Sequence, residues 1–113
     1  MADKSATFTN VPGPTLTWDA VATADTEIGY ALNGTDSYKG MVQIDGTFGS
    51  ATVVLQGSVD GTTYTTLKDT AGNNISTTSA AVFLFDTRAN YLRPLVSGGT
   101  GDSLNIRVTL RRG

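Results

Sequence analysis

The stretch Ser103-Leu104-Asn105-Ile106-Arg107-Val108-Thr109-Leu110-Arg111 decides the fold class of this chain. Its even positions are apolar, and its odd positions are polar or basic. Successive side chains of a β-strand point to opposite faces of a sheet, so this period of two predicts a strand with one buried face. No window of the sequence shows a convincing helical period. The chain is therefore predicted to be all-β.

Seven further segments carry strand-forming residues and are separated by turn-forming ones. They are 15–21, 27–32, 40–45, 51–58, 62–67, 81–85 and 91–96. The segment 81–85 is apolar throughout, which predicts a buried strand. Pro94, within 91–96, has no backbone donor and predicts an edge or a position without a ladder hydrogen bond.

The alternation in two of these segments predicts which side chains face the core. In 15–21, Leu16, Trp18 and Ala20 share one face. In 27–32, Ile28, Tyr30 and Leu32 do the same.

Turn residues fix the connections between the strands. Asp60-Gly61 indicates a hairpin between 51–58 and 62–67, because Gly adopts positive φ at no steric cost. The stretches 33–37, 69–74 and 97–102 are rich in Gly, Asn, Asp, Ser and Thr and predict further turns. About eight strands joined in this way predict a two-sheet antiparallel sandwich or jelly roll.

The domain organisation follows from length and composition. A chain of 113 residues favours one domain. Residues 1–14 are polar and contain Pro12-Gly13-Pro14, so they predict an N-terminal arm or linker before a β domain over 15–113. No apolar run is long enough to span a bilayer, and the N-terminus has no apolar signal-peptide core. We expect no membrane partner and synthesis in a cytoplasm.

Composition argues against catalysis. The chain has no histidine and no cysteine, which removes the usual nucleophilic triads and zinc ligand sets. Its net charge of −2 and the lack of a basic stripe argue against a nucleic-acid partner. We predict a chain that is not an enzyme and has no catalytic residue, cofactor or metal site.

The carboxylates support that prediction. Glu27 is the only glutamate, and most aspartates stand in turn-like contexts where their side chains bond the local backbone: Asp36, Asp45, Asp60, Asp69 and Asp102. Oxygen atoms of Asp60, Asp69 and Asn73 are available to calcium, but no Asp-x-Asp-x-Asp-Gly loop brings them together.

Two aromatic residues and one basic face are the remaining candidates for binding. Trp18 is either a stacking platform or a core residue in phase with Leu16, and we favour the core. Tyr64 is either an exposed platform or a cross-strand packing residue, and we favour packing. The basic residues of the last strand, Arg107, Arg111 and Arg112, fit either a protected sheet edge or an interface with an acidic partner.

Two motifs resemble small bacteriophage virion proteins. The first is Gly57-Ser58-Val59-Asp60-Gly61-Thr62-Thr63-Tyr64 between two strands, and the second is Tyr91-Leu92-Arg93-Pro94 followed by Ser97-Gly98-Gly99. The resemblance covers residues 51–113. It implies a capsid decoration (cement) subunit that binds a major capsid protein on the virion surface, as a homo-oligomer with a trimer as the first expectation.

The same hairpin is also similar to that of discoidin-like carbohydrate-binding modules. That resemblance implies an alternative, a carbohydrate-binding module or a tail or fibre adhesion component. The aromatic loop residues that bind sugars in those modules have no match here.

Overall fold

The computed structural model describes residues 3–9, 15–23, 25–32 and 38–112. Within these ranges the chain is all-β, and no helix is present that is long and apolar enough to cross a membrane. Six strands have seven or more residues: β3 (Thr15–Val21), β6 (Tyr38–Thr47), β7 (Thr52–Ser58), β10 (Ala81–Thr87), β11 (Tyr91–Ser97) and β12 (Ser103–Arg112). The short strands are β1 (Asp3–Lys4), β2 (Thr7–Thr9), β4 (Thr26–Glu27), β5 (Tyr30–Ala31), β8 (Thr65–Thr66) and β9 (Ser76–Thr77).

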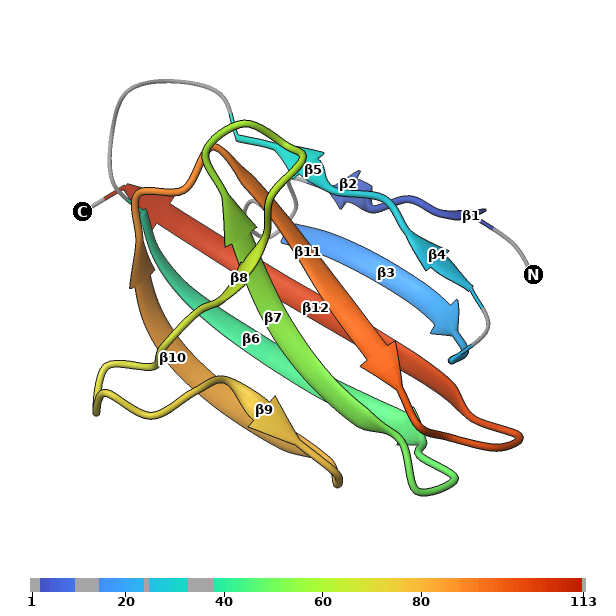
Figure 1. Ribbon diagram of the computed structural model, residues 1–113. Coiled ribbons are helices and arrows are strands. Elements are labelled where there is room, and N and C mark those ends of the chain that lie inside the picture. The colour runs from blue at the N-terminus through green and yellow to red at the C-terminus, as the bar shows by residue number, and fades with distance from the viewer. Residues whose placement is uncertain (1–2, 10–14, 24, 33–37, 113) are drawn as a thin grey trace.

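Two five-stranded sheets pack face to face (Figure 1). One has the order β10-β6-β12-β3-β2, and the other has β5-β11-β7-β8 with β9 also paired to β7. We count β3, β5, β6, β7, β8, β10, β11 and β12 as the first to eighth strands. The first sheet then contains strands 1-8-3-6, and the second contains 2-7-4-5. This is the strand order of a jelly roll, which is one of the two predicted architectures.

The buried side chains of both sheets form one core. Trp18 and Leu16 come from β3, Leu55 and Val53 from β7, and Phe85 from β10. The four apolar residues of the last strand, Leu104, Ile106, Val108 and Leu110, are all buried, so the predicted half-buried strand is confirmed. Because a strand residue contributes to one face only, the polar residues between them lie on the outside of the sheet.

A β-bulge changes which residue of β3 enters the core. Leu104 pairs with Val21 and Ile106 with Trp18, so β3 has one more residue than β12 between these pairs. Ala20 takes a φ of 52° there and donates its amide to Asn105 Oδ1 at 3.1 Å. The extra residue shifts the alternation. The prediction that Ala20 shares the core face was wrong, and Val21 takes that place with no exposed surface.

The predicted strand 27–32 is divided into β4 and β5, and its first part has the opposite orientation. Glu27 is buried, whereas Ile28 is 39% exposed. Gly29 separates the two short strands and lies so close to Tyr64 that a Cβ atom there would meet its ring and hydroxyl group. The expectation that Ile28 shares a buried face with Tyr30 and Leu32 was therefore wrong.

The apolar segment 81–85 is buried on one face only. In β10, Phe85 is buried, but Val82 is 55% and Leu84 53% exposed. Val82 and Leu84 alternate with the residues of β10 that face the core, so their side chains lie on the outer face of the sheet. The prediction of a buried strand was therefore wrong for Val82 and Leu84.

The N-terminal segment pairs with the sandwich over its described part. β1 pairs in parallel with β4, and β2 pairs antiparallel with β3. The expected polar arm is thus edge-strand structure over residues 3–9. Its remaining part, 10–14, and the predicted turn at 33–37 lie outside the described residues.

Pro94 occupies a position in β11 that requires no ladder donor. The Val96 amide donates to Glu27 Oε2 at 2.8 Å, away from β7. Backbone amides point to alternate sides along a strand. Pro94 is two residues from Val96, so its nitrogen also faces away from β7. Beyond Tyr91 and Leu92, no described strand pairs with β11 on that side.

We expect Trp18→Phe to lower the free energy of unfolding by about 2 kcal/mol, through lost packing and an unsatisfied carbonyl. The indole Nε1 donates to the Ile28 carbonyl at 3.0 Å, and this bond joins β3 to the segment between β4 and β5. Urea unfolding followed by circular dichroism measures the change. Thr17→Ala, on the outer face of the same strand, is the control and should stay within about 0.5 kcal/mol of the wild type. An equal effect of both substitutions would contradict the assignment.

Candidate assembly surface

An exposed apolar strip, formed by Met41, Val82 and Leu84, lies on the outer face of the sheet that contains β6 and β10. Met41 and Leu84 are directly opposite each other in the β6–β10 register, and Val82 is the next outward residue along β10. Met41 is 44% exposed, Leu84 53% and Val82 55%. Clustered apolar side chains of this kind mark contact surfaces more often than scattered single ones do.

Charged residues border the strip at both ends. At one end Asp86, Lys39 and Arg111 are in register across β10, β6 and β12. At the other, Arg107 forms an ion pair of 2.8 Å with Asp45. Across the described chain, no residue forms an ion pair with Lys39, Arg111 or Asp86. A shallow groove between these charges and the strip is lined by Lys39, Met41, Thr70, Leu84, Asp86, Thr109 and Arg111, among others.

The edge of β10 beside this groove is partly covered. The Thr70 amide, in the loop between β8 and β9, donates to the Leu84 carbonyl at 2.9 Å. That bond occupies one of the outward-facing backbone groups of the edge strand. A covering loop is a common way to prevent a sheet edge from pairing with other chains. The strip is therefore available through its side chains, while backbone pairing is hindered at Leu84.

The last strand lies inside its sheet over most of its length. β12 pairs with β6 from Ser103 to Arg112 and with β3 from Leu104 to Thr109. The edge alternative was therefore wrong for Arg107, whereas Arg111 and Arg112 lie beyond the described pairing with β3. Arg107 forms an ion pair with Asp45, and Arg111 lines the groove. Arg112 is the register partner of Tyr38 in β6.

A rigid loop connects β7 to β8, and we call its residues Val59 and Asp60 the hairpin tip. Asp60 Oδ1 accepts the amides of Thr62 and Thr63 at 2.9 Å, and Ser58 Oγ accepts the Gly61 amide at 2.9 Å. Gly61 has a φ of 78°, as predicted from Asp60-Gly61. The loop is wider than predicted, because these bonds hold residues 59–64 outside the ladder and leave only Thr65–Thr66 as β8.

Tyr64 is a packing residue. It is partly buried, and the Arg93 guanidinium lies 3.9 Å from the centre of its ring. Arg93 Nε donates to Gln56 Oε1 at 2.9 Å, and Gln56 and Arg93 are register partners. Burial raises the pKa of the Tyr64 hydroxyl. One ring face is thus covered by Arg93, and the preference for packing over an exposed platform agrees with this geometry.

Trp18 is not a binding platform. Its side chain has no exposed surface, as the preferred core assignment predicted. A stacking role for Trp18 in sugar binding was therefore wrong.

The aspartates considered as calcium ligands accept hydrogen bonds from the backbone amides of their own turns. Asp69 Oδ1 accepts the amides of Ala71 and Asn73, both at 2.9 Å, and the backbone closes the same turn with a bond from Gly72 to the Asp69 carbonyl. Asp60 holds the hairpin tip. In the described part of the chain, no three acidic, histidine or cysteine residues come together as a metal site would require.

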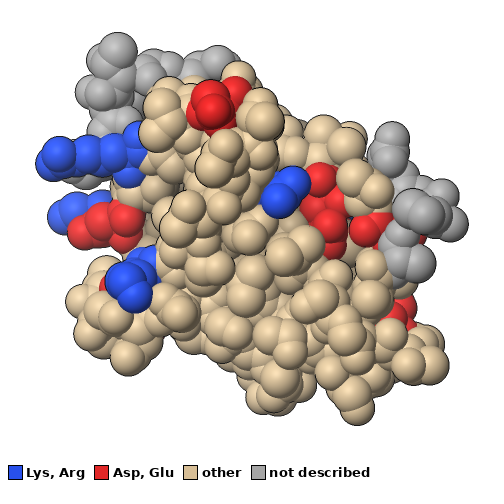
Figure 2. Space-filling model, in the orientation of Figure 1, with Lys and Arg blue, Asp and Glu red and all other residues tan. Residues whose placement is uncertain are grey.

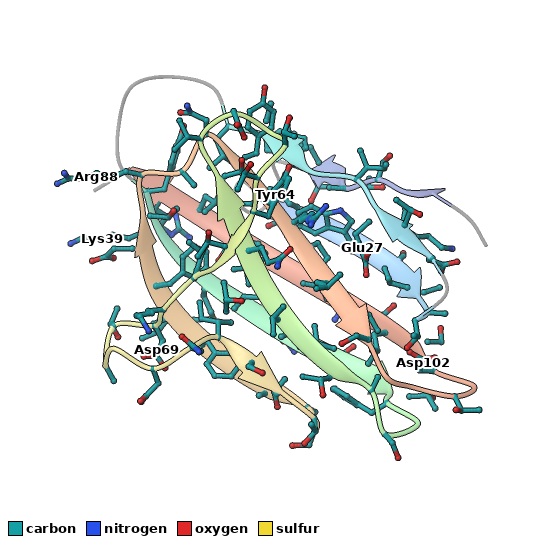
Figure 3. The ribbon with its side chains drawn as sticks, viewed as in Figure 1. Glu27, Lys39, Tyr64, Asp69, Arg88 and Asp102 are labelled. Carbon is teal, nitrogen blue, oxygen red and sulfur yellow. The ribbon has the colours of Figure 1, made fainter. Side chains whose placement is uncertain are left out.

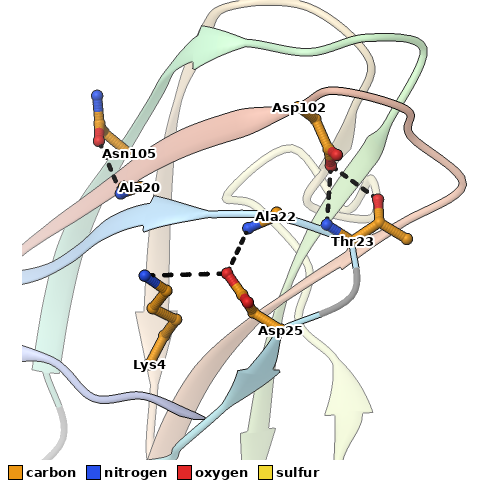
Figure 4. A network of polar contacts seen from close by, with 7 residues as sticks. All are labelled: Lys4, Ala20, Ala22, Thr23, Asp25, Asp102 and Asn105. Carbon is orange, nitrogen blue, oxygen red and sulfur yellow. Dashed lines mark hydrogen bonds and ion pairs between the residues drawn. The ribbon is translucent and has the colours of Figure 1, made fainter. Parts of the chain in front are cut away.

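Asp25 and Asp102 stabilise loops at the opposite end of the sandwich (Figure 4). Asp102 Oδ2 accepts the Thr23 amide at 3.0 Å and its hydroxyl at 2.7 Å. Asp25 Oδ2 accepts the Ala22 amide at 2.9 Å and lies 3.9 Å from Lys4 Nζ. These carboxylates are satisfied by local donors, which leaves them a structural role.

Glu27 is a buried carboxylate for which the sequence pattern predicted no role. It is 6% exposed and accepts the Val96 amide on the free side of β11. Burial raises the pKa of Glu27, although the Val96 amide and the charge of Arg93 act in the opposite direction. No pattern in the sequence signalled that Glu27 is buried. Adjacent strand residues face opposite sides, and the apolar Ile28 was expected to be the buried one of the two.

The face formed by β7, β8 and β11 carries little charge (Figure 2). Lys and Arg gather at one margin, where Lys39 and Arg88 project from the body of the protein (Figure 3), and the lower middle of the face carries no charge. At the ends of β7 and β11 away from the hairpin tip, the outward-facing residues are Thr52, Val54, Leu95 and Ser97, and we call these four the uncharged face. Val54 and Leu95 are register partners.

Two solved structures share this fold. The SPBc2 prophage-derived protein YomS superposes with a TM-score of 0.61 at 16% identity, over 86% of this chain and 93% of that chain. A structure of Bacillus endospore appendages, described as a novel family of disulfide-linked pili, gives a TM-score of 0.53 at 22% identity, over 96% and 88%. At these identities the likeness shows the fold alone. No protein-family model and no curated protein sequence matches the chain.

We expect Glu27→Gln to gain stability relative to the wild type as the pH rises. A raised pKa means that the folded state holds the Glu27 proton more tightly than the unfolded chain does. Wild-type stability from this group is therefore fully present below the unfolded value of about 4.5 and is lost as the pH rises through the folded pKa. Glutamine does not titrate, so it avoids that loss.

Urea unfolding of both chains at pH 4 and pH 7 tests this expectation. The free energy of unfolding of Glu27→Gln minus that of the wild type should be more positive at pH 7. Asp19→Asn, at an exposed carboxylate, serves as the control for removal of one negative charge. The same difference at both pH values would show that Glu27 titrates alike in the folded and unfolded states.

Proposed function

We propose that this chain is a structural subunit of a bacteriophage particle, specifically a capsid decoration subunit that binds the outer surface of the shell and stabilises it. The jelly-roll fold supports a structural role, and one of the proteins that shares it is prophage-derived. A protein that binds the assembled shell more tightly than its free subunits shifts the equilibrium towards the shell. The expected location is the virion surface.

The arrangement of the described carboxylates supports a binding function better than a catalytic one. Asp25, Asp60, Asp69 and Asp102 each accept at least one hydrogen bond from a nearby backbone amide. A general acid–base mechanism requires a pair of titratable groups that face a common cavity. Among the described carboxylates, Glu27 has a pKa raised by burial, and its oxygen is occupied by the Val96 amide.

The uncharged face is the observation that carries the proposal. The centres of protein interfaces are depleted of charged residues, because charges lose their hydration there. Thr52, Val54, Leu95 and Ser97 present such a surface on two strands that pair with each other along their whole length. A rigid surface loses little conformational entropy when it binds. We infer that this face lies against the major capsid protein.

The competing function is carbohydrate binding, in a tail or fibre component. It depends on aromatic side chains that remain accessible, and Trp18 is excluded by its burial. The partly buried Tyr64 and the pair Phe8–Tyr30, stacked at 6.3 Å between ring centres, are two candidates among the partly exposed aromatic side chains.

Co-sedimentation with purified empty shells of the phage that carries the gene for this chain tests the proposal. The wild-type chain should pellet with shells at micromolar concentration. Val54→Arg, in the middle of the uncharged face, should weaken binding by about tenfold or more, since about 1.4 kcal/mol of lost interaction gives that factor. Ala71→Arg, an exposed loop substitution of the same charge, is the control and should bind as the wild type does.

Two results would overturn the proposal. One is a folded wild-type chain that stays in the supernatant at every concentration. The other is specific retention on a glycan array that is lost in Tyr64→Ala, which would favour the carbohydrate-binding alternative.

A further inference from the structure

The hairpin tip presents an apolar side chain that has no contact role within its own chain. Val59 is 77% exposed, the largest fraction among the large apolar side chains described. Its carbonyl accepts Asn90 Nδ2 at 3.0 Å, and the Asn90 amide donates to the neighbouring Ser58 carbonyl at 2.9 Å. The loop therefore holds Val59 in a fixed position in solvent. A preorganised apolar residue of this kind is suited to insertion into a partner.

The next residue of the tip adds a fixed negative charge. Hydrogen bonds from the Thr63 and Thr62 amides and from the Ser58 hydroxyl hold the pKa of Asp60 below its usual value. These bonds use Oδ1. Across the described residues, none donates a hydrogen bond to Oδ2. The tip thus offers one apolar group beside one carboxylate oxygen that is available to an external donor.

The groove on β6, β10 and β12 has the complementary pattern. Met41 and Leu84 provide an apolar surface, and Lys39 and Arg111 are register partners beside it. These two cations outnumber the single anion, Asp86, on the same rim. Rows of side chains two residues apart along a strand are about 7 Å apart. Adjacent residues, about 3.8 Å apart at Cα, can reach both rows when their side chains diverge.

We propose that the hairpin tip of one copy docks into this groove of a second copy, with Val59 against Met41 and Leu84 and Asp60 between Lys39 and Arg111. The contact joins two different surfaces, so it is heterologous and, when repeated, closes a ring or extends a filament. The chain has no cysteine, so copies are held by these non-covalent contacts. The inference concerns contacts between copies and does not depend on what the uncharged face binds.

A contact through one apolar residue and one charge is small. It gains strength when a ring closes, because the last contact forms within one assembly, and when copies are held side by side on a particle. Exposed charges take part, so the contact should weaken as salt screens them.

Sedimentation velocity over a range from about 1 μM to 1 mM, with Val59→Lys and Leu84→Glu and their combination, tests the contact. The wild type should assemble with rising concentration, and assembly should weaken several-fold between low and high salt. Each single variant should assemble about tenfold more weakly, because it places a charge in an apolar contact. The double variant should recover part of the loss, since the introduced ammonium group then faces the introduced carboxylate.

Ile28→Lys is the matched control, because Ile28 is an exposed apolar residue outside both surfaces. It should assemble as the wild type does, and the urea midpoint of every variant shows whether it is folded. A wild type that stays monomeric to about 1 mM, or single variants that assemble like the wild type, would overturn the contact. A double variant whose loss of assembly free energy equals the sum of the losses of the two single variants would also overturn it.

The two proposals fail separately. A monomeric wild type that still pellets with shells would refute the contact between copies and leave the decoration function standing. A wild type that assembles but does not bind shells would refute the decoration function and leave the contact between copies standing.

Discussion

The fold depends on the position of β12 at the centre of its sheet. Its register with β6 runs without interruption from Ser103 to Arg112, and its other side pairs with β3. A slip of one residue would turn the four apolar side chains of β12 outward and its polar ones into the core. The core of the opposite sheet packs on these residues, so one alternating segment sets the register of its neighbours and the filling of the sandwich.

This dependence explains why much of the fold was predictable. The alternation in 103–111 and in 15–21 defined strands whose observed bounds agree within about one residue, and Asp60-Gly61 marked the position of a hairpin. A period of two reports a sheet with one solvated face, and that is the situation of both strands. The sequence therefore indicated strands and turns wherever the local alternation of apolar and polar residues matched the side chains' burial in the folded protein.

Predictions failed where the environment was set by distant residues. The apolar residues Val82 and Leu84 are exposed because they lie on the outer face of their sheet, which an unbroken apolar run does not reveal. Glu27 is buried because β11 has an amide to satisfy at Val96. The core place of Val21 depends on a bulge opposite Asn105. For the candidate surface, only Asp60 and the basic residues of β12 were noted in advance, since exposure of Met41, Val59 and Leu84 is not encoded in local alternation.

The bond from Thr70 to the Leu84 carbonyl has a consequence for how such a protein assembles. With that carbonyl occupied, any chain that meets β10 at Leu84 finds side chains to contact and no free carbonyl on which to extend a backbone ladder. Contacts between a few side chains dissociate quickly, whereas cross-β stacks are kinetically persistent. The bond from Thr70 therefore protects the edge strand at Leu84 from the persistent kind of contact and leaves its side chains accessible to the reversible kind.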